Sequence, residues 1–255
     1  MSTPLVIKLG GKVLTDQHSL QHLLRIISKL AVIRALVLVH GGGDQVQQLL
    51  EQLGQQSIKS AGQRITPTSH IPIVAGVLAG DVNSQLCAQA QLHGLNAVGL
   101  TLFAGHSVRC QVDTARGAVG IPQPGDSKLL EQLIDQGFVP VISSVGVSAS
   151  GERLNVNADL AAASIAQLLH ADLILLTDVP GILDHHGQLL EHIHADQAAA
   201  LIADGTVRDG MQVKLEAALK AAHASRRSIA VAGWQDANAL TRLAKGEAAG
   251  TRISV

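Results

Sequence analysis

The chain has 255 residues, 47% of them apolar, which is enough to bury the core of one large α/β domain or of two lobes that share a sheet. Only 1% of the residues are aromatic and the formal net charge is −1, so a base-stacking surface or a general attraction to nucleic acid is not expected. The N-terminal residues show no basic segment followed by a long apolar run, and the longest apolar stretches fall short of the ~20 residues that cross a bilayer. We therefore expect a cytoplasmic protein with small-molecule ligands and no membrane partner.

Short β-branched runs alternate with longer segments of helical period along the chain. Strands are expected at Leu5–Leu9, Ala35–His40, Ala97–Leu100, Val139–Ser143, Leu173–Thr177 and Ile229–Ala232. Helices are expected at Leu20–Leu30, Asp44–Leu53, Asp81–His93, Ser127–Gln136, Ala158–Leu169 and Met211–Ala224. Several strands are apolar on both faces, as strands covered by helices on either side are. This pattern predicts an α/β fold, a three-layer αβα sandwich around a central, mainly parallel sheet.

Two segments do not fit the alternation. Residues 57–66 and 107–119 are interpreted as hairpin insertions at the rim of the sheet. A soft boundary near His170 divides the chain into an N-terminal lobe, residues 1–170, and a C-terminal lobe, residues 171–255.

Two strand ends are rich in glycine. Lys8-Leu9-Gly10-Gly11 combines a lysine with backbone that can approach an anion closely, although an ordinary turn would explain this motif equally well. Gly41-Gly42-Gly43 lies between a buried strand and a helix, for which Asp44 is the expected N-cap, and free N–H groups with the helix dipole favour an anion there. Parallel strands bring such ends to one edge of a sheet, where α/β proteins bind ligands.

Polar residues gather at three further places. Asn155 and Asn157 share one face if their segment is extended, Asn157 is placed to cap the following helix, and Asp159 falls in its first turn. Capping alone would explain only one of the three residues. Arg64, on the first hairpin, offers a rigid donor fork that suits a carboxylate, although a solvated surface arginine is the common alternative. Lys214 is expected in the first turn of its helix, where it opposes the helix dipole.

These motifs together resemble the amino-acid kinase family over essentially the whole chain. The motifs that carry the resemblance are KLGG from Lys8, VHGGG from Val39, GQRITP from Gly62, NVNAD from Asn155, TDVPGIL from Thr177 and DGM-x-x-K from Asp209. Two of these motifs are more specific. Arg64-Ile65-Thr66 followed by the NVNAD run, in this order and spacing, resembles the branch of the family that phosphorylates N-acetyl-L-glutamate. The resemblance implies a two-lobed sandwich whose N-terminal lobe binds the amino acid and forms a dimer, and whose C-terminal lobe binds ATP.

The resemblance also assigns roles. It implies that two lysines stabilise the transferring phosphoryl group and that one aspartate organises them, namely Lys8, Lys214 and Asp159. Glycine amides would cradle phosphoryl oxygens and the bound substrate, those of Gly10, Gly11, Gly42 and Gly43. The substrate carboxylate would be held by Arg64 and Asn155, with Asn157 nearby. The nucleotide would be bordered by Asp178, Val179, Pro180, Gly181, Ile182, Leu183, Thr206, Val207 and Arg208. The resemblance implies ATP as the cofactor, with Mg²⁺ carried by the nucleotide, and assigns no residue as a metal ligand.

The chain departs from the family pattern at two positions. Gln63 stands where the family usually has an apolar residue, and the loop Leu102–Ser107 lacks the acidic residue often found there. In this family an N-terminal helical extension accompanies hexamers inhibited by arginine. Because Lys8 lies so near the start, the resemblance implies an arginine-insensitive homodimer of bacterial type.

The chemistry suits a site without a general base. A γ-carboxylate has a reference pKa near ~4.3 and is already ionised at neutral pH, so the work is to align two anions and offset their repulsion. We expect ATP-dependent phosphorylation of the γ-carboxylate of N-acetyl-L-glutamate, a step of arginine biosynthesis. Two alternatives stay open, a kinase of the same fold for acetylaminoadipate or carbamate, and a non-catalytic sensor of an amino acid or nucleotide.

Overall fold

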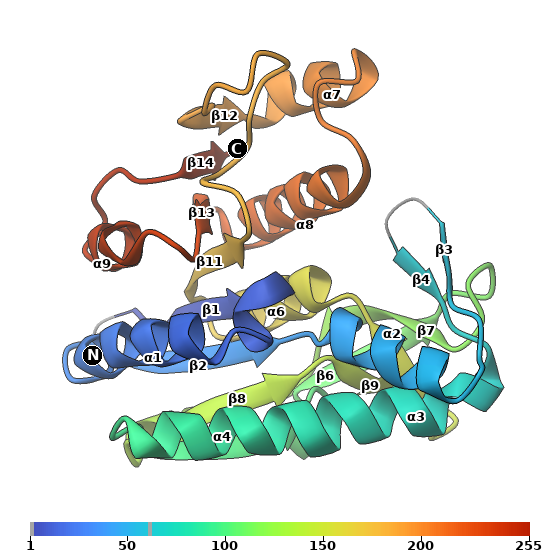
Figure 1. The fold of residues 1–255 in the computed structure, drawn as a ribbon. Coiled ribbons are helices and arrows are strands. Elements are labelled where there is room, and N and C mark those ends of the chain that lie inside the picture. The colour runs from blue at the N-terminus through green and yellow to red at the C-terminus, as the bar shows by residue number, and fades with distance from the viewer. Residues whose placement is uncertain (1–2, 61–62) are drawn as a thin grey trace.

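The computed structural model describes residues 3–60 and 63–255. Its central sheet has the strand order β12-β14-β13-β11-β1-β2-β8-β5 (Figure 1). Every neighbouring pair in this sheet is parallel except β13 and β14. The strands are β1 (Leu5–Leu9), β2 (Leu36–His40), β5 (Ala97–Thr101), β8 (Val139–Ser143), β11 (Asp172–Thr177), β12 (His192–His194), β13 (Ile229–Gly233) and β14 (Thr251–Ser254). The predicted mainly parallel sheet is confirmed.

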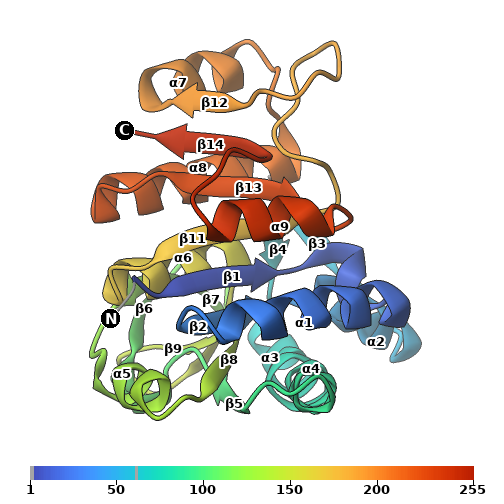
Figure 2. The same ribbon diagram turned by 90° about the vertical axis from the view of Figure 1, so that its left-hand side faces the viewer.

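Helices cover both faces of the sheet, which confirms the three-layer sandwich (Figure 2). Residues of α1, α4 and α9 pack on one face, and residues of α6 and α8 pack on the other. The helices are α1 (Gln17–Ala31), α2 (Gly43–Gln52), α3 (Ile71–Ala75), α4 (Asn83–Leu92), α5 (Lys128–Asp135), α6 (Ala158–Leu168), α7 (Ala195–Ala203), α8 (Asp209–Ser225) and α9 (Ala237–Ala244).

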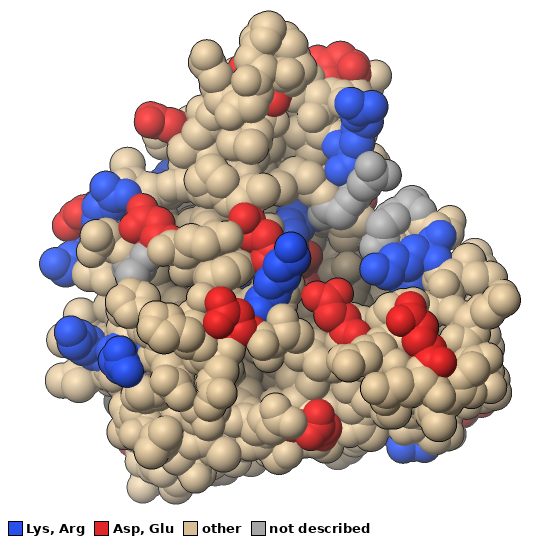
Figure 3. Space-filling model, viewed as in Figure 1, with Lys and Arg blue, Asp and Glu red and all other residues tan. Residues whose placement is uncertain are grey.

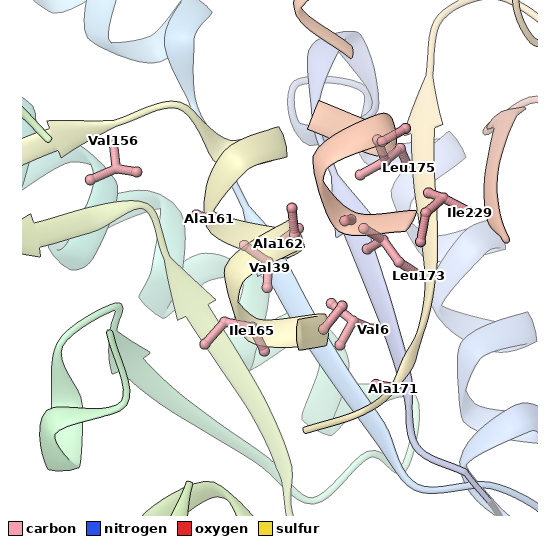
Figure 4. Packing of buried hydrophobic residues seen from close by; sticks show 14 of the residues in the cluster. Val6, Val39, Val156, Ala161, Ala162, Ile165, Ala171, Leu173, Leu175 and Ile229 are labelled. Carbon is pink, nitrogen blue, oxygen red and sulfur yellow. The ribbon is translucent and has the colours of Figure 1, made fainter. Parts of the chain in front are cut away.

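The alternation of side chains along β1 decides where its lysine points. Leu5, Ile7 and Leu9 belong to the core beneath α1, whereas Val6 belongs to the core beneath α6. Because successive strand residues face opposite sides, Lys8 shares the side of Val6. The alanines on α6, such as Ala161 and Ala162, let this helix lie close against the sheet (Figure 4).

A second sheet lies beside the first, in the order β6-β7-β10-β9. Its strands are β6 (Val108–Val112), β7 (Val119–Pro124), β9 (Val145–Val147) and β10 (Arg153–Val156). A hairpin does begin in the predicted segment 107–119, but its second strand starts only at Val119 and extends to Pro124, so the predicted bounds are wrong. The hairpin belongs to this second sheet, where β7 pairs with β10, and not to the rim of the central sheet. The other predicted hairpin is β3 (Ile58–Ser60) with β4 (Gln63–Ile65), and the turn between them lies outside the described residues.

One helical segment of the described chain, Thr68–Leu92, is long and apolar enough by composition to cross a membrane. It is built from a 3₁₀ turn, α3, a π-helical stretch at Gly76–Val82, and α4. Its buried side chains pack within the protein, with Leu86 against the central sheet and Val74 against α2, and it also buries the polar Asn83. These contacts are those of a core helix with one side against the sheet.

Two local predictions at helix starts are wrong. Asp44 is not an N-cap, because α2 begins at Gly43 with Gly42 at the capping position and no side-chain cap. Gly42 has φ 157°, a conformation that glycine adopts readily, and this lets the chain enter the helix one residue earlier than expected. Lys214 lies in the second turn of α8 rather than the first, because the helix already begins at Asp209. Its predicted conflict with the helix dipole is correspondingly weaker.

Candidate active site

Two lysines and one aspartate meet on the α6 side of the sheet. Lys8 Nζ lies 3.0 Å from Asp159 Oδ1, and Lys214 Nζ donates a hydrogen bond of 2.9 Å to Asp159 Oδ2. The side chains of Lys8 and Asp159 are each 7% exposed and that of Lys214 is 17% exposed. The three come from β1, α6 and α8, so the fold unites residues that lie far apart in the sequence. The buried triad carries one excess positive charge, which favours an anion beside it.

The two lysines determine the ionisation of Asp159. Burial alone would raise the pKa of this carboxyl, but the ion pairs with Lys8 and Lys214 outweigh burial and lower the pKa to about 2. Burial lowers the pKa of Lys8, an effect that Asp159 opposes and the second lysine reinforces. Asp159 therefore remains ionised and holds both ammonium groups in place at neutral pH.

This pKa predicts an acid-dependent loss of stability. The folded-state pKa of Asp159, about 2, lies below its ordinary value of 3.8, so the unfolded chain binds the extra proton between these values. The ion pairs thus contribute about 2 kcal/mol that is present above pH ~4 and is lost as the pH falls towards ~2. Urea unfolding of the wild type and of Asp159→Asn between pH 2 and 5 measures this contribution. The stability difference between the two proteins is expected to shrink on acidification, and a difference independent of pH would contradict the assignment.

The glycine-rich ends of β1 and β2 border a cleft of about 220 Å³ beside the triad. Lys8, Asp159, Gly10, Gly11 and the run Gly41–Gly43 all line it. A methyl group added to Gly10 would overlap the Lys8 ammonium group, and Gly43 faces open space. The absence of side chains here therefore leaves room for the lysine and exposes backbone to the cleft. The predicted convergence of the two glycine motifs is found in the structure.

The hairpin β3–β4 forms another wall of the cleft. Arg64 Nη2 donates a 3.0 Å hydrogen bond to the Gly43 carbonyl, and Arg64 Nη1 donates one of 3.0 Å to Gln47 Oε1 and another to Ser57 Oγ. Arg64 is half-buried, and burial lowers the pKa of its guanidinium while Asp44 and Glu51 oppose that shift. The arginine is thus fixed to the start of α2, with its charge beside the cleft.

The two asparagines of the NVNAD motif form hydrogen bonds to different parts of the protein. Asn157 caps α6 as predicted, since its side chain accepts hydrogen bonds from the N–H groups of Asp159 and Leu160 at 2.9 and 3.2 Å. Asn155 donates a 2.9 Å hydrogen bond to Thr66 Oγ1, which joins β10 to the end of the hairpin. Both asparagines line the cleft.

The segment assigned to the nucleotide after β11 lies outside this cleft. Asp178 Oδ1 accepts a 2.7 Å hydrogen bond from Trp234 Nε1 and a 3.2 Å bond from the Lys12 N–H. Gly11, with φ 68°, packs against the same carboxylate. Beyond Asp178, the chain continues through Val179, exposed Pro180, buried Gly181, Ile182 in the hydrophobic core, and Leu183. Asp178 therefore fixes the turn after β1 to the C-terminal part of the sheet.

The second segment assigned to the nucleotide precedes α8. Val207 is buried and its N–H donates to the Leu201 carbonyl, Thr206 is half-buried, and exposed Arg208 occupies the N-cap position of α8. None of these residues lines the cleft at the triad. The structure therefore groups the triad, the glycine motifs, Arg64 and the asparagines, and leaves the two C-terminal segments apart from that group.

The hairpin carries a second cation that no sequence motif indicated. Lys59 lines the cleft and is the cross-strand partner of Arg64 in the β3–β4 pair. Like charges directly opposite one another on a hairpin are unfavourable without an anion between or beside them. The strand alternation would have revealed this pair, had the register of the hairpin been fixed from the sequence. Ser144 also lines the cleft and carried no motif signal, whereas Gln63, which lines it too, stood out in the sequence only as a departure from the family pattern.

Comparisons with known proteins identify the family of the chain. Residues 3–233 match the model of the amino acid kinase family. The chain belongs to the amino acid kinase family. It is 46% identical to acetylglutamate kinase of Colwellia psychrerythraea over 251 residues, which cover 98% of this chain and 96% of the relative. It is also 46% identical to acetylglutamate kinase of Pectobacterium carotovorum, with 98% of each chain covered. Among solved structures, smu.665 of Streptococcus mutans superposes with a TM-score of 0.84 at 28% identity, covering 100% of this chain and 99% of that one.

Proposed function

We propose that this chain transfers the terminal phosphoryl group of ATP to the γ-carboxylate of N-acetyl-L-glutamate, the reaction expected of an acetylglutamate kinase in arginine biosynthesis. The observation that carries the proposal is the placement of Lys8 and Lys214 on one buried carboxylate, at the edge of a cleft walled by two glycine motifs. Both ammonium groups can approach a single phosphoryl group from that position. Near full-length identity of 46% to acetylglutamate kinases supports this choice of substrates.

The proposed roles follow from charge. The substrate carboxylate is ionised at neutral pH, so it attacks phosphorus without losing a proton to the enzyme. As the phosphoryl group moves, Lys8 and Lys214 offset the charge on its oxygens, and Asp159 keeps both lysines in position. Backbone N–H groups of Gly10, Gly11, Gly42 and Gly43 are the proposed donors to the phosphoryl oxygens. Mg²⁺ is proposed to enter with ATP and to offset the charge of the nucleotide phosphates when bound.

Arg64 is proposed to bind a carboxylate of the amino acid, with Asn155 and Lys59 nearby. In Arg64→Lys, the ammonium group keeps the charge but loses the planar fork that now reaches Gly43 and Gln47. We expect the KM for N-acetyl-L-glutamate to rise about tenfold, with kcat and the KM for ATP nearly unchanged, as for loss of one charge-assisted contact. Steady-state kinetics checks this, with Arg109→Lys, at an exposed position of β6, as the control. A rise confined to the KM for ATP would show that Arg64 binds the nucleotide and not the amino acid.

The nucleotide is proposed to lie on the C-terminal side, along residues 178–183 and 206–208. Residues 178–183 follow β11, which pairs with β1, the strand that carries Lys8. Residues 206–208 precede α8, which carries Lys214. The Asp178 carboxylate already accepts two hydrogen bonds from the protein. We therefore assign it to positioning the turn after β1 rather than to direct contact with ATP.

A homodimer is proposed through the N-terminal lobe. Strand β5 ends the strand order of the central sheet, and the exposed side of α4 beside it carries Leu92, which is 70% exposed. An open strand edge next to an exposed leucine suits a second copy of the chain better than solvent.

On the face shown in Figure 3, basic and acidic side chains stand in small groups of mixed sign. The division into lobes at residue 170, the cytoplasmic location and the insensitivity to arginine stay predictions from the sequence.

Release of ADP tests the proposed function. The purified chain is mixed with ATP, Mg²⁺ and one acid at a time, with N-acetyl-L-glutamate, L-glutamate, N-acetyl-L-aminoadipate and carbamate as the panel. The proposal expects the highest kcat/KM with N-acetyl-L-glutamate. A higher value with N-acetyl-L-aminoadipate or carbamate would support the related-acid kinase. Aminoadipate is the stricter comparison, because it differs from glutamate by one methylene, which discriminates by only ~1–3 kcal/mol. No turnover with any acid, together with measurable binding of ATP, would support a non-catalytic sensor.

A further inference from the structure

A buried histidine lies directly behind the triple-glycine loop. His40, the last residue of β2, has no exposed surface, and Asn83 at the start of α4 is only 5% exposed. His40 Nδ1 lies 2.7 Å from the Gly41 carbonyl oxygen, and His40 Nε2 lies 2.9 Å from Asn83 Nδ2. Neither residue has a part in the phosphoryl-transfer scheme described above.

The partners of the imidazole define which nitrogen carries its proton. The Gly41 carbonyl can only accept, so Nδ1 must donate to it. Asn83 Nδ2 also donates a 2.9 Å hydrogen bond to the Val141 carbonyl, which fixes the orientation of the amide and leaves it a donor towards Nε2. His40 is thus held neutral with the proton on Nδ1. Burial, which lowers the pKa of His40 to about 4 against the raising effect of Gly41, agrees with a neutral ring.

Asn83 is itself held from the far side. The Cys87 thiol donates to Asn83 Oδ1 across 3.9 Å, and Gly99 on β5 leaves the space that this oxygen occupies. A methyl group at Gly99 would overlap Asn83 Oδ1. The hydrogen bonds therefore form a series from Cys87 on α4 through Asn83 and His40 to the glycine loop.

The series has a consequence for the cleft. The Gly41 N–H donates to the Leu9 carbonyl at 3.3 Å and the Gly41 carbonyl is held by His40, so this residue is fixed on both sides. In a trans peptide the C=O of one residue and the N–H of the next point in opposite directions. With the Gly41 carbonyl directed at the buried ring, the Gly42 N–H is directed away from the ring, and Gly42 itself lines the cleft.

We infer that His40 and Asn83 are positioning residues for phosphoryl transfer, which hold the Gly41–Gly42 peptide in the one orientation that presents its N–H to the transferring group. This inference rests on the proposed function. It assigns a task to the histidine of the VHGGG motif that involves no proton transfer and no contact with substrate. Loss of the donor at Nδ1 frees the peptide to rotate, and a misdirected N–H no longer stabilises charge that develops in the transition state.

Two substitutions of His40 separate this role from a merely structural one. The amide nitrogen of His40→Asn can occupy the place of Nδ1 and donate to Gly41, whereas the amide of His40→Gln reaches the place of Nε2 and contacts Asn83 instead. Each variant keeps one of the two hydrogen bonds, so a structural role predicts similar losses in Tm and kcat for both. We expect similar Tm values, kcat within about threefold of wild type for His40→Asn, and a kcat about tenfold or more lower for His40→Gln, with both KM values little changed. Equal kcat values in the two variants would overturn the inference.

Gly99→Ala tests the same series without touching the loop, and serves if a His40 variant fails to fold. The new methyl group displaces the Asn83 amide, so kcat should fall while the KM values hold. Gly76→Ala, which meets no atom within 4 Å and lies in the same long helical segment as Asn83, is the control and should retain wild-type kcat. Unchanged kcat in Gly99→Ala would count against the inference.

A spectroscopic reading is independent of the substrate. ¹⁵N NMR of histidine-labelled protein, with the His40 signals identified from their loss in His40→Asn, should show Nδ1 protonated and Nε2 unprotonated at pH 7. The opposite tautomer would overturn the inference even if the acid substrate were another one. A wild type that turns over no acid, with the expected tautomer present, would instead contradict only the proposed function.

Discussion

Replacing Lys8 by methionine is expected to lower kcat by about 100-fold or more, while the KM values for ATP and the acid change by less than about threefold. The methionine preserves most of the side-chain volume and removes the ammonium group that now lies 3.0 Å from Asp159 Oδ1. Since Lys214 still pairs with Asp159, the buried carboxylate keeps one cation and the fold should persist. The loss therefore falls on the transition state, where the negative charge spreads over the phosphoryl oxygens.

The matched control for this prediction is Lys128→Met. Lys128 lies at the start of α5 with 82% of its side chain exposed, and its contact with Asp126 is a loose 3.7 Å pair. Turnover of this variant should equal that of the wild type. Near-normal kcat in a correctly folded Lys8→Met protein would remove the lysine from the mechanism.

Asp159→Asn should cause the largest loss of stability among the variants of the site, about 3 kcal/mol in the free energy of unfolding. The amide leaves two buried ammonium groups, those of Lys8 and Lys214, without a counter-charge. Removing one of the charges as well, in Asp159→Asn with Lys8→Met, should restore part of that free energy because a single buried cation costs less than two. The kcat should remain low in both proteins, so the second substitution is expected to recover stability without recovering activity. Urea unfolding and steady-state kinetics at pH 7 measure the two quantities.

The control for the stability measurement is Asp126→Asn, which removes the charge from a solvent-exposed pair but keeps a side-chain oxygen that can accept the hydrogen bond from the Lys128 N–H. Its unfolding curve should be nearly unchanged. If the double variant at the triad were less stable than Asp159→Asn alone, the excess positive charge would not be what destabilises the single variant. That result would contradict the electrostatic account of the triad.

The central sheet could be predicted from the sequence because its strands are buried on both faces and bounded by turn residues. The six predicted strands coincide with β1, β2, β5, β8, β11 and β13 within a residue or two at each end. The short strands β12 and β14 at one end of the sheet were missed, since three or four residues with partly exposed side chains give little period. The second sheet was also missed, because its pairing of β7 with β10 joins residues 36 positions apart, such as Val119 and Asn155.

The sequence indicates which residues belong to the site better than it indicates how they are arranged in space. Glycine runs and the cap at Asn157 have local signals, and the structure confirms that both glycine motifs and Asp159 meet in one cleft. That Lys214 reaches the same carboxylate depends on how α8 packs against α6, which no local pattern specifies. The His40–Asn83 pair had no signal either, because a histidine at a strand end reads the same whether or not an amide from another helix meets it.

A crystal structure with ADP, Mg²⁺, N-acetyl-L-glutamate and a planar phosphoryl mimic such as AlF₄⁻ tests the central claim most directly. The account predicts that Nζ of Lys8 and Nζ of Lys214 both contact the mimic, with the Gly42 N–H directed at it and the acid's γ-carboxylate in line with the leaving oxygen. A mimic held elsewhere, with the two ammonium groups still turned only towards Asp159, would contradict it.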